Sequence, residues 1–245
     1  MAHLTKVDKD YFKEHGYVVI RDALNPQVID AALEVIWNNV EADRNNPASW
    51  IDKGYQAFDI GGTDALKRTI YAEPVFAMAE EMVGKGTLHT DGGVTPHISF
   101  PSPNSEWHPP TGHLDGYYTP SNGVPKGGVS VFTLGVTIYL GRVESKGGGF
   151  MVWPESHKIF AEYFRHHDID SLEGGVAPFD LGAGMEVTGG PGDVCFWHNQ
   201  LSHTASTNIS RDVRIALIGR VSRKDLEQIK YETPRDMWKY WDGIN

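Results

Sequence analysis

The sequence predicts a mainly β protein with flanking helices, built around a double-stranded β-helix, that is, a jelly-roll core. From about residue 95 onward, short β-like runs with a hydrophobic period of two are separated by Gly and Pro. The chain holds 27 Gly and 14 Pro among 245 residues, as a fold with many tight turns requires. We therefore expect a single domain over 1–245, with helical support over about 1–90, the jelly-roll core over about 95–222 and a C-terminal helix or tail over 223–245.

The first third of the chain is expected to form helices around one strand. Residues 5–8, "TKVD", resemble a capping box before a short helix, and "GYVVI" (16–20) is a β-rich run. Asn25 is a suitable N-cap for the next helix, because Pro follows it in the first turn. The apolar residues of that helix recur at helical spacing, at Ile29, Ala32, Leu33, Ile36 and Val40. A further helical segment is expected over 65–83, with a start or break near Pro74.

The second part of the chain is expected to supply the strands. In "VSVFTLGVTIYL" (129–140), large apolar residues alternate with a mixed set, so one face suits a core and the other suits a cavity. The residues of the mixed face include Thr133, Thr137 and Tyr139. Further strands are expected at 148–153, 193–198, 202–207 and 213–221. A helix over 156–167 and a long loop over 170–184 are expected to cover one mouth of the barrel.

Charge and cysteine content narrow the class of protein. A formal net charge of -10 argues against a nucleic-acid or anionic-membrane partner, because binding phosphates needs a basic surface. Cys195 is the only cysteine, which excludes an internal disulfide framework and fits a reducing compartment. The opening "MAHLTKVDKDYFKEHGY" lacks the apolar core of a signal peptide, and no run reaches the ~18 to 20 apolar residues that span a bilayer. We expect a cytoplasmic monomer or homodimer whose substrate is a small molecule.

Three His-x-Asp triplets are candidates for a metal site. They begin at His89, His113 and His166. Two ligands at positions i and i+2 share one face of an extended chain but not of a helix, and His166 ends a predicted helix. Asp91 precedes two glycines and suits a turn in which its carboxylate bonds to local amides. The triplet of His113 and Asp115, in "GHLDGYY", is therefore the favoured one.

A metal site of this kind needs a third ligand. Two His and one carboxylate on one face of an octahedron hold non-haem Fe(II) and leave three positions open for reactants. The candidates for the second histidine are His157, His198 and His203. A hairpin turn near "NISRD" would bring Arg214 beside the strand that carries His203, and Arg is suited to bidentate capture of a carboxylate. This combination favours His203.

Four stretches, taken in order, resemble the phytanoyl-CoA dioxygenase family of Fe(II)- and 2-oxoglutarate-dependent oxygenases. "YFKEHGYVVIRDALNPQVIDAALEVI" is similar to the family's first strand and helix, and "HLD" to its metal motif. "GGGFMVWPESHK" is similar to its Gly-rich strand, and "GDVCFWHNQLSHTASTNISRDVR" to its distal His followed by Arg. The likeness covers most of the chain, and Arg214 follows His203 by eleven residues, as in the family.

The resemblance implies a role for each motif residue. His113, Asp115 and His203 would bind the iron, and Arg214 would bind the distal carboxylate of 2-oxoglutarate. The chain departs from the family pattern at two cosubstrate positions. Ala205 stands where relatives often have Ser, and Thr137 stands where they often carry a bulky aromatic, which implies either a roomier pocket or a different hydrogen bond. The family's contact on the first barrel strand corresponds to either His97 or Ser99.

The resemblance also implies an activity. It is that of a dioxygenase that uses Fe(II), 2-oxoglutarate and O2 to hydroxylate or desaturate an unactivated C–H bond of a small molecule, with release of succinate and CO2. Related halogenases leave the carboxylate position vacant for a halide, so Asp115 favours hydroxylation or desaturation.

Two alternatives stay open at the level of the sequence. One is a cupin-like metalloenzyme that does not use 2-oxoglutarate, such as an isomerase or an oxygenase whose substrate is the reductant, with Arg214 in a structural role. The other is a non-catalytic jelly-roll module that binds a ligand through its many aromatic residues.

Overall fold

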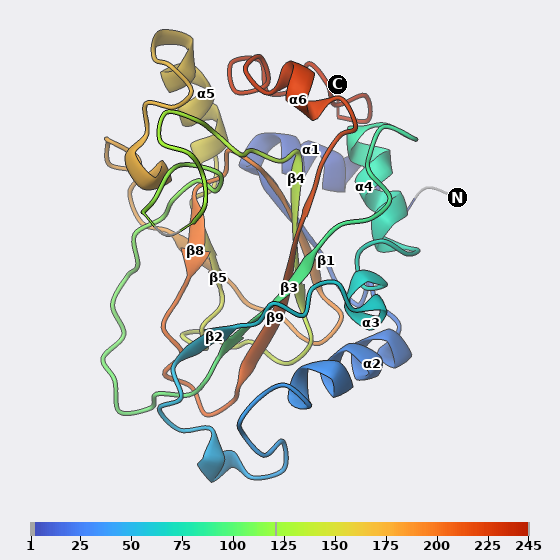
Figure 1. Cartoon of the computed structure of the whole chain (residues 1–245), viewed down its shortest axis with the longest axis vertical. Coiled ribbons are helices and arrows are strands. Elements are labelled where there is room, and N and C mark those ends of the chain that lie inside the picture. Colours follow the sequence, from blue (N-terminus) through green and yellow to red (C-terminus); the bar gives the residue numbers. More distant parts are fainter. Residues whose placement is uncertain (1–2, 121, 245) are drawn as a thin grey trace.

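The computed structural model describes residues 3–120 and 122–244, and two facing antiparallel sheets form its centre (Figure 1). In spatial order, the larger sheet contains β1 (Tyr17–Ile20), β7 (Val194–His198), β4 (Leu134–Tyr139), β9 (Arg214–Val221), β3 (Val94–Ser99) and β2 (Tyr55–Ala57). The smaller sheet contains β6 (Met185–Val187), β5 (Phe150–Val152) and β8 (His203–Ala205). The predicted jelly-roll core with flanking helices is confirmed.

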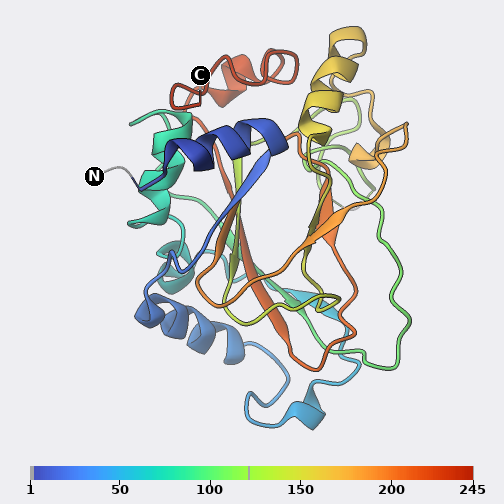
Figure 2. The same ribbon diagram turned by 180° about the vertical axis from the view of Figure 1, so that it is seen from behind.

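Helices cover the outer face of the larger sheet and one end of the barrel (Figure 2). The α-helices are α1 (Lys6–His15), α2 (Pro26–Trp37), α3 (Asp64–Lys67), α4 (Val75–Val83), α5 (Ser156–His166) and α6 (Leu226–Ile229). Two short 3-10 helices, η1 (Pro47–Ser49) and η2 (Glu173–Gly175), complete the set among the described residues. Helices α1 to α4 lie against the larger sheet, whereas α5 lies beyond the end of the smaller one.

The predicted helix signals are mostly confirmed. Thr5 accepts a hydrogen bond from the backbone N–H of Asp8, whose carboxylate accepts one from Thr5 N–H, so the capping box is complete. Asn25 caps α2 by accepting from Gln27 N–H at 2.9 Å. The segment expected to be helical over 65–83 is interrupted, because α3 ends at Lys67 and α4 begins directly after Pro74, the expected start. Helix α2 ends earlier than its apolar stripe, since Val40 lies beyond the helix and only packs against the same core.

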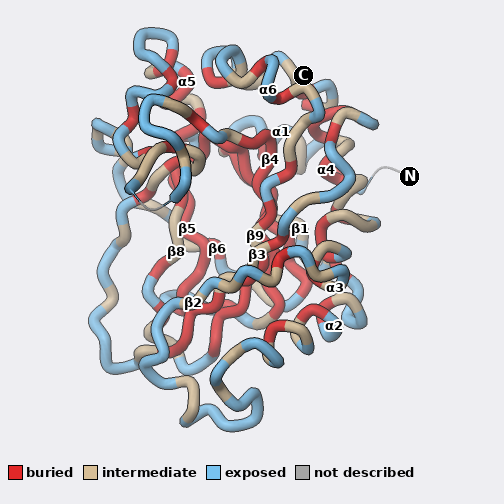
Figure 3. Tube along the Cα trace, viewed as in Figure 1, coloured by how far each residue is buried: buried red, intermediate tan, exposed pale blue. Residues whose placement is uncertain are grey.

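Strand β4 is buried on both faces (Figure 3). Leu134, Val136 and Ile138 pack against the helices. The other face meets the smaller sheet, where Tyr139 donates a hydrogen bond to Val187 O and accepts one from Phe150 N–H. The mixed face expected to border a cavity is therefore part of a second core at Tyr139.

The two less favoured triplets lie in the predicted environments, a helix end for His166 and a turn for Asp91. His166 ends α5, is 71 % exposed in its side chain and contacts Glu162. Asp91 accepts from Gly92 N–H and pairs with Lys67 on the surface. The predicted loop after α5 packs on that helix, because Leu172 lies in the same hydrophobic cluster as Phe160 and Phe164.

The C-terminal segment packs on α1 and on the end of β7. Trp241 packs against Phe12 of α1 at 5.4 Å between ring centroids and against His198 at 5.3 Å. Within residues 3–120 and 122–244, no helix combines the length and the apolar character needed to cross a bilayer.

Candidate metal and cosubstrate site

His113 and His203 are brought together by backbone pairing. Residues around His113 form no regular strand, yet His113 N–H donates to His203 O and His203 N–H donates to His113 O, each at 3.0 Å. Residues that exchange both hydrogen bonds lie directly opposite each other, with side chains on the same face. The two imidazole rings accordingly lie 5.0 Å apart between centroids.

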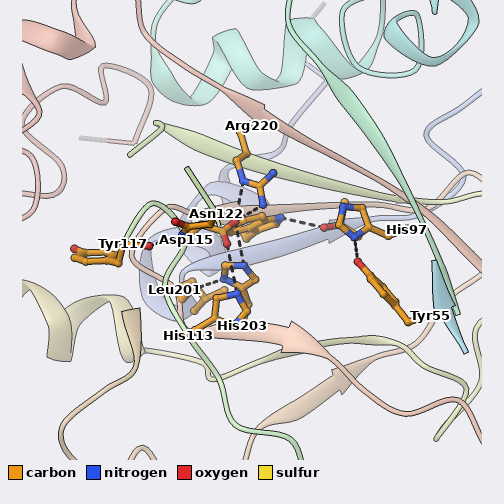
Figure 4. A network of polar contacts seen from close by, with 11 residues as sticks. Tyr55, His97, His113, Asp115, Tyr117, Asn122, Leu201, His203 and Arg220 are labelled. Carbon is orange, nitrogen blue, oxygen red and sulfur yellow. Dashed lines mark hydrogen bonds and ion pairs between the residues drawn. The ribbon is translucent and has the colours of Figure 1, made fainter. Parts of the chain in front are cut away.

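Asp115 completes a compact group of three metal-ligating side chains (Figure 4). Its Oδ1 lies 3.4 Å from His113 Nε2, and its Oδ2 lies 3.4 Å from His203 Nε2. One ligand atom of each residue lies within 4.8 Å of those of the other two. The set of donors, two imidazoles and one carboxylate, fits a facial triad for non-haem iron.

Local contacts set the protonation states of His203 and Asp115 that metal binding requires. The Nδ1 atom of His203 lies 2.9 Å from Leu201 O, so it carries the ring proton and Nε2 is free to bind a metal. Burial on its own would raise the pKa of Asp115, but the charges and hydrogen bonds of His203, His113 and Arg220 lower that pKa far below its usual range. Asp115 is therefore a carboxylate at neutral pH.

Arg220 on β9 is a site residue that none of the sequence motifs indicates. Its Nε and Nη2 both donate to Asp115 Oδ2, at 2.8 and 2.6 Å, and its guanidinium carbon lies 5.8 Å from the ring centroid of Phe132. Alternation along β9 places Arg220 on the same face as Arg214, so the strand period was a usable signal.

Arg214, at the start of β9, is a buried cation without an acidic partner. The residue is 2 % exposed; its Nε donates to Gly148 O at 2.5 Å and its Nη1 donates to His97 O at 2.9 Å. Burial lowers the pKa of Arg214, yet a guanidinium remains charged in proteins. The charge of Glu186 favours the charged form of Arg214, but no carboxylate in the described part of the chain forms an ion pair with it. An anion in the cavity would therefore compensate the buried charge further.

The triad and Arg214 line one cavity of about 470 Å³. His97 and Ser99 of β3 also line it, as do residues of β8 and the segment that follows it. A ligand in this cavity can therefore reach the candidate metal position and Arg214 together.

Comparison with known proteins supports a site for iron and 2-oxoglutarate. The family model for phytanoyl-CoA dioxygenase (PhyH) matches residues 12–216. The chain belongs to the phytanoyl-CoA dioxygenase family. It is thus an Fe(II)- and 2-oxoglutarate-dependent dioxygenase that uses O2. A search of curated proteins finds no significant match.

Solved structures share the fold of this family member at low identity. HygX from Streptomyces hygroscopicus, with nickel and 2-oxoglutarate bound, is 14 % identical, with a TM-score of 0.59 and coverage of 90 % of this chain and 88 % of HygX. The epimerase SnoN from nogalamycin biosynthesis is 17 % identical, with a TM-score of 0.59 and coverage of 89 % and 82 %. The carbocyclase SnoK from the same biosynthesis is 19 % identical, with a TM-score of 0.59 and coverage of 93 % and 91 %.

Thr137 is not brought to the cavity of this phytanoyl-CoA dioxygenase family member. Its hydroxyl accepts a hydrogen bond from Trp197 Nε1 at 3.1 Å, and both side chains are buried. The indole of Trp197 covers β4, because a Cβ on Gly135 would lie 2.1 Å from it. The same indole lies 4.2 Å from the His203 ring, between centroids. The space expected beside Thr137 is thus filled by a tryptophan from the neighbouring strand.

The two candidates on the first barrel strand have different surroundings. Ser99 is the register partner of Arg214, so it lies at the Arg214 end of the cavity. The backbone carbonyl of His97 accepts a hydrogen bond from Arg214, and the Nδ1 atom of the His97 ring contacts the hydroxyl of Tyr55 on β2. Burial and the charges of Arg214 and Arg220 lower the pKa of His97 to about 4, so its ring is neutral.

The other two histidines considered as ligands lie elsewhere. His157 and His198 are buried, with ring centroids 5.7 Å apart, and the ring of His157 packs against Trp238 of the C-terminal segment. His157 Nε2 contacts Lys13 O at 3.2 Å, so its role is a structural hydrogen bond. Neither residue lines the cavity.

Proposed function

We propose that this dioxygenase hydroxylates or desaturates an unactivated C–H bond of a small molecule and releases succinate and CO2. In this proposal, His113, Asp115 and His203 bind Fe(II), and Arg214 binds the distal carboxylate of 2-oxoglutarate. The proposal treats residues 1–245 as a single catalytic domain that works in the cytoplasm as a monomer or homodimer.

The observation that carries the proposal is the position of Arg214. Its guanidinium is buried, has backbone carbonyls as its hydrogen-bond acceptors and borders the same cavity as the triad. A dicarboxylate that reaches from the triad to Arg214 would compensate the buried charge, which gives the enzyme a physical reason to keep an arginine there.

The residues of the chain each have a defined task. When bound, the iron with 2-oxoglutarate and O2 supplies the oxidation of the C–H bond. His203 keeps its proton on Nδ1, and Asp115 stays ionised, so both present a lone pair to the metal. Trp197 and Phe150 pack against the His203 ring and exclude water from that side. The substrate would enter the open part of the cavity.

The neighbours favour a small-molecule substrate. One structure of HygX contains nickel, 2-oxoglutarate and hygromycin B, and one of SnoN contains Fe3+, 2-oxoglutarate and nogalamycin RO, so proteins of this fold bind small molecules together with a metal and the cosubstrate. The cavity of about 470 Å³ suits a ligand of that general class better than a protein chain.

Turnover of 2-oxoglutarate in air tests this function. Iron-loaded protein should form succinate slowly without a substrate and faster with one, and the product should have gained one oxygen atom or lost two hydrogen atoms by mass spectrometry. Asp115→Ala should abolish succinate formation, whereas Arg142→Gln, a surface variant at a pair with Glu144, should not. Folded wild-type protein that retains iron yet never consumes 2-oxoglutarate would contradict the proposal.

A further inference from the structure

The cavity carries a positive charge in an acidic protein. Its charged lining residues are Asp115, Arg214 and Arg220, so one carboxylate faces two guanidinium groups. His97 is neutral because of its lowered pKa, and metal-bound histidines are neutral imidazoles. The formal charge of the lining is thus one positive unit, although the chain as a whole has a net charge of -10.

Bound iron and cosubstrate would leave this excess unchanged. A divalent cation and the dianion of 2-oxoglutarate cancel each other. The distal carboxylate of 2-oxoglutarate would compensate Arg214, and Asp115 would share its charge with the metal. The positive charge of Arg220 is then the one that is not fully neutralised. A cation next to a divalent metal is electrostatically unfavourable unless an anion binds between them.

The guanidinium of Arg220 has one donor edge in use and one available. The Nε and Nη2 edge is held by Asp115 Oδ2. Nη1 has no hydrogen-bond partner among the described residues, and Nη2 keeps a second N–H. The side chain is 40 % exposed and borders the cavity, and the Phe132 ring supports the guanidinium. The available edge has the geometry for bidentate binding of a carboxylate.

We propose that the substrate carries a carboxylate, which binds the Nη1 and Nη2 edge of Arg220. This inference rests on the proposed function, and it assigns the chemical class of the substrate. A cationic substrate is disfavoured, because Asp115 is the single acidic side chain in the described lining and is already shared by two histidines and Arg220.

The contact with Asp115 also predicts which part of the substrate reacts. Arg220 touches a proposed metal ligand directly, at 2.6 Å. A carboxylate held by Arg220 therefore keeps the carbon atoms nearest to it beside the metal position. The oxidised C–H bond should lie within a few bonds of the substrate carboxylate.

The test measures binding to protein that already holds Fe(II) and 2-oxoglutarate. Under argon, hexanoate, cyclohexanecarboxylate and phenylacetate are titrated while the iron-to-2-oxoglutarate charge-transfer band is recorded, and the corresponding primary amides and alkylamines serve as matched probes. The acids should shift the band, and in air they should speed succinate formation. Arg220→Gln should weaken acid binding by about 30-fold or more, because it removes a charged bidentate partner.

Two further variants distinguish bidentate binding of the substrate carboxylate by Arg220 from a general effect of positive charge. Arg220→Lys keeps the charge without the two-pronged edge, so it should bind acids better than Arg220→Gln and less well than wild type. Arg142→Gln removes a surface arginine whose side chain is 75 % exposed and should leave acid binding unchanged. Titrating Fe(II) and 2-oxoglutarate into each variant checks that both still bind at saturation.

Several outcomes would overturn the substrate class. They are a band that amides or amines shift as well as acids do, equal acid binding by Arg220→Gln and wild type, and no effect of any acid up to its solubility limit. Acids that bind only by displacing 2-oxoglutarate would also overturn it, since they would occupy Arg214. If no charge-transfer band forms at all, the proposed function fails, and the substrate class falls with it.

Discussion

His113 and His203 exchange both backbone hydrogen bonds across an isolated bridge, each at 3.0 Å. This pairing joins the loop that carries "HLD" to β8, so the spacing of the two rings is fixed by the backbone before any metal binds. Residues that hold this loop in place should therefore affect metal binding without touching the metal.

Gly112 is the clearest such residue. A Cβ at this position would lie 2.4 Å from Ser202 Oγ and 2.5 Å from the Trp153 ring, whose Nε1 is held by Gly182 O. Gly112→Ala should lower the free energy of unfolding by about 1 to 3 kcal/mol and weaken metal binding, because the loop must move away. Urea denaturation and metal titration measure the two effects.

The matched control for that change is Gly62→Ala, since a Cβ on Gly62 meets nothing within 4 Å. It should leave both stability and metal binding close to wild type. Equal metal affinity in Gly112→Ala and wild type would show that the pairing of His113 with His203 does not depend on a close-packed loop.

Thr137 should act through Trp197 and not through 2-oxoglutarate. Thr137→Val removes the acceptor of the Trp197 Nε1 hydrogen bond and leaves a buried N–H unpaired, which costs about 1 to 3 kcal/mol of stability. The Kd for 2-oxoglutarate at saturating iron should change much less than in Arg214→Gln. A large rise in that Kd for Thr137→Val, with stability preserved, would instead indicate a direct contact with the cosubstrate.

Arg214 should matter for the cosubstrate and not for the metal. Arg214→Gln should raise the Kd for 2-oxoglutarate by about 30-fold or more, because a buried carboxylate would lose its charged bidentate partner. Equilibrium dialysis with Fe(II) alone should give wild-type metal binding. Loss of metal binding together with cosubstrate binding would assign Arg214 a purely structural role through Gly148 and His97.

Stability should fall in mild acid because of buried histidines. Burial lowers the pKa of His157 from 6.5 to about 4 and that of His198 well below 6.5. Between pH 6.5 and 4 the unfolded chain binds protons that the folded chain excludes, so stability is full above pH 6.5 and is lost as the pH falls towards 4. The slope contributed by His157 should approach about 1.4 kcal/mol per pH unit.

Urea denaturation across this pH range tests that expectation in wild type and in His157→Gln. The variant keeps an amide donor for Lys13 O but does not titrate, so its stability should depend less steeply on pH. The same slope in both proteins would be evidence against a neutral, buried His157.

The sequence could predict those parts of the site that have fixed spacing. The order of "HLD", the distal His and the Arg eleven residues later predicted a set that the structure brings to one cavity. Strand alternation also predicted which face of β4 packs against the helices, and cap residues predicted where α1 and α2 begin.

The site residues that the sequence did not predict reach their positions through the pairing of strands that are distant in the sequence. Tyr55 reaches the cavity because β2 pairs with β3, and no local pattern in the sequence indicates that pairing. Trp197 covers Thr137 because β7 lies beside β4, so a residue that faces inward still does not reach the cavity. Arg220 follows the period of β9, but its contact with Asp115 requires the fold of a distant loop.

Binding of 2-oxoglutarate to the iron is measured best by an anaerobic titration of iron-loaded protein with 2-oxoglutarate, followed by visible absorption. We predict a weak metal-to-ligand charge-transfer band that saturates with one 2-oxoglutarate per chain and needs much more cosubstrate in Arg214→Gln. Folded protein that binds Fe(II) but develops no band at any 2-oxoglutarate concentration would show that the site does not bind the cosubstrate through its metal.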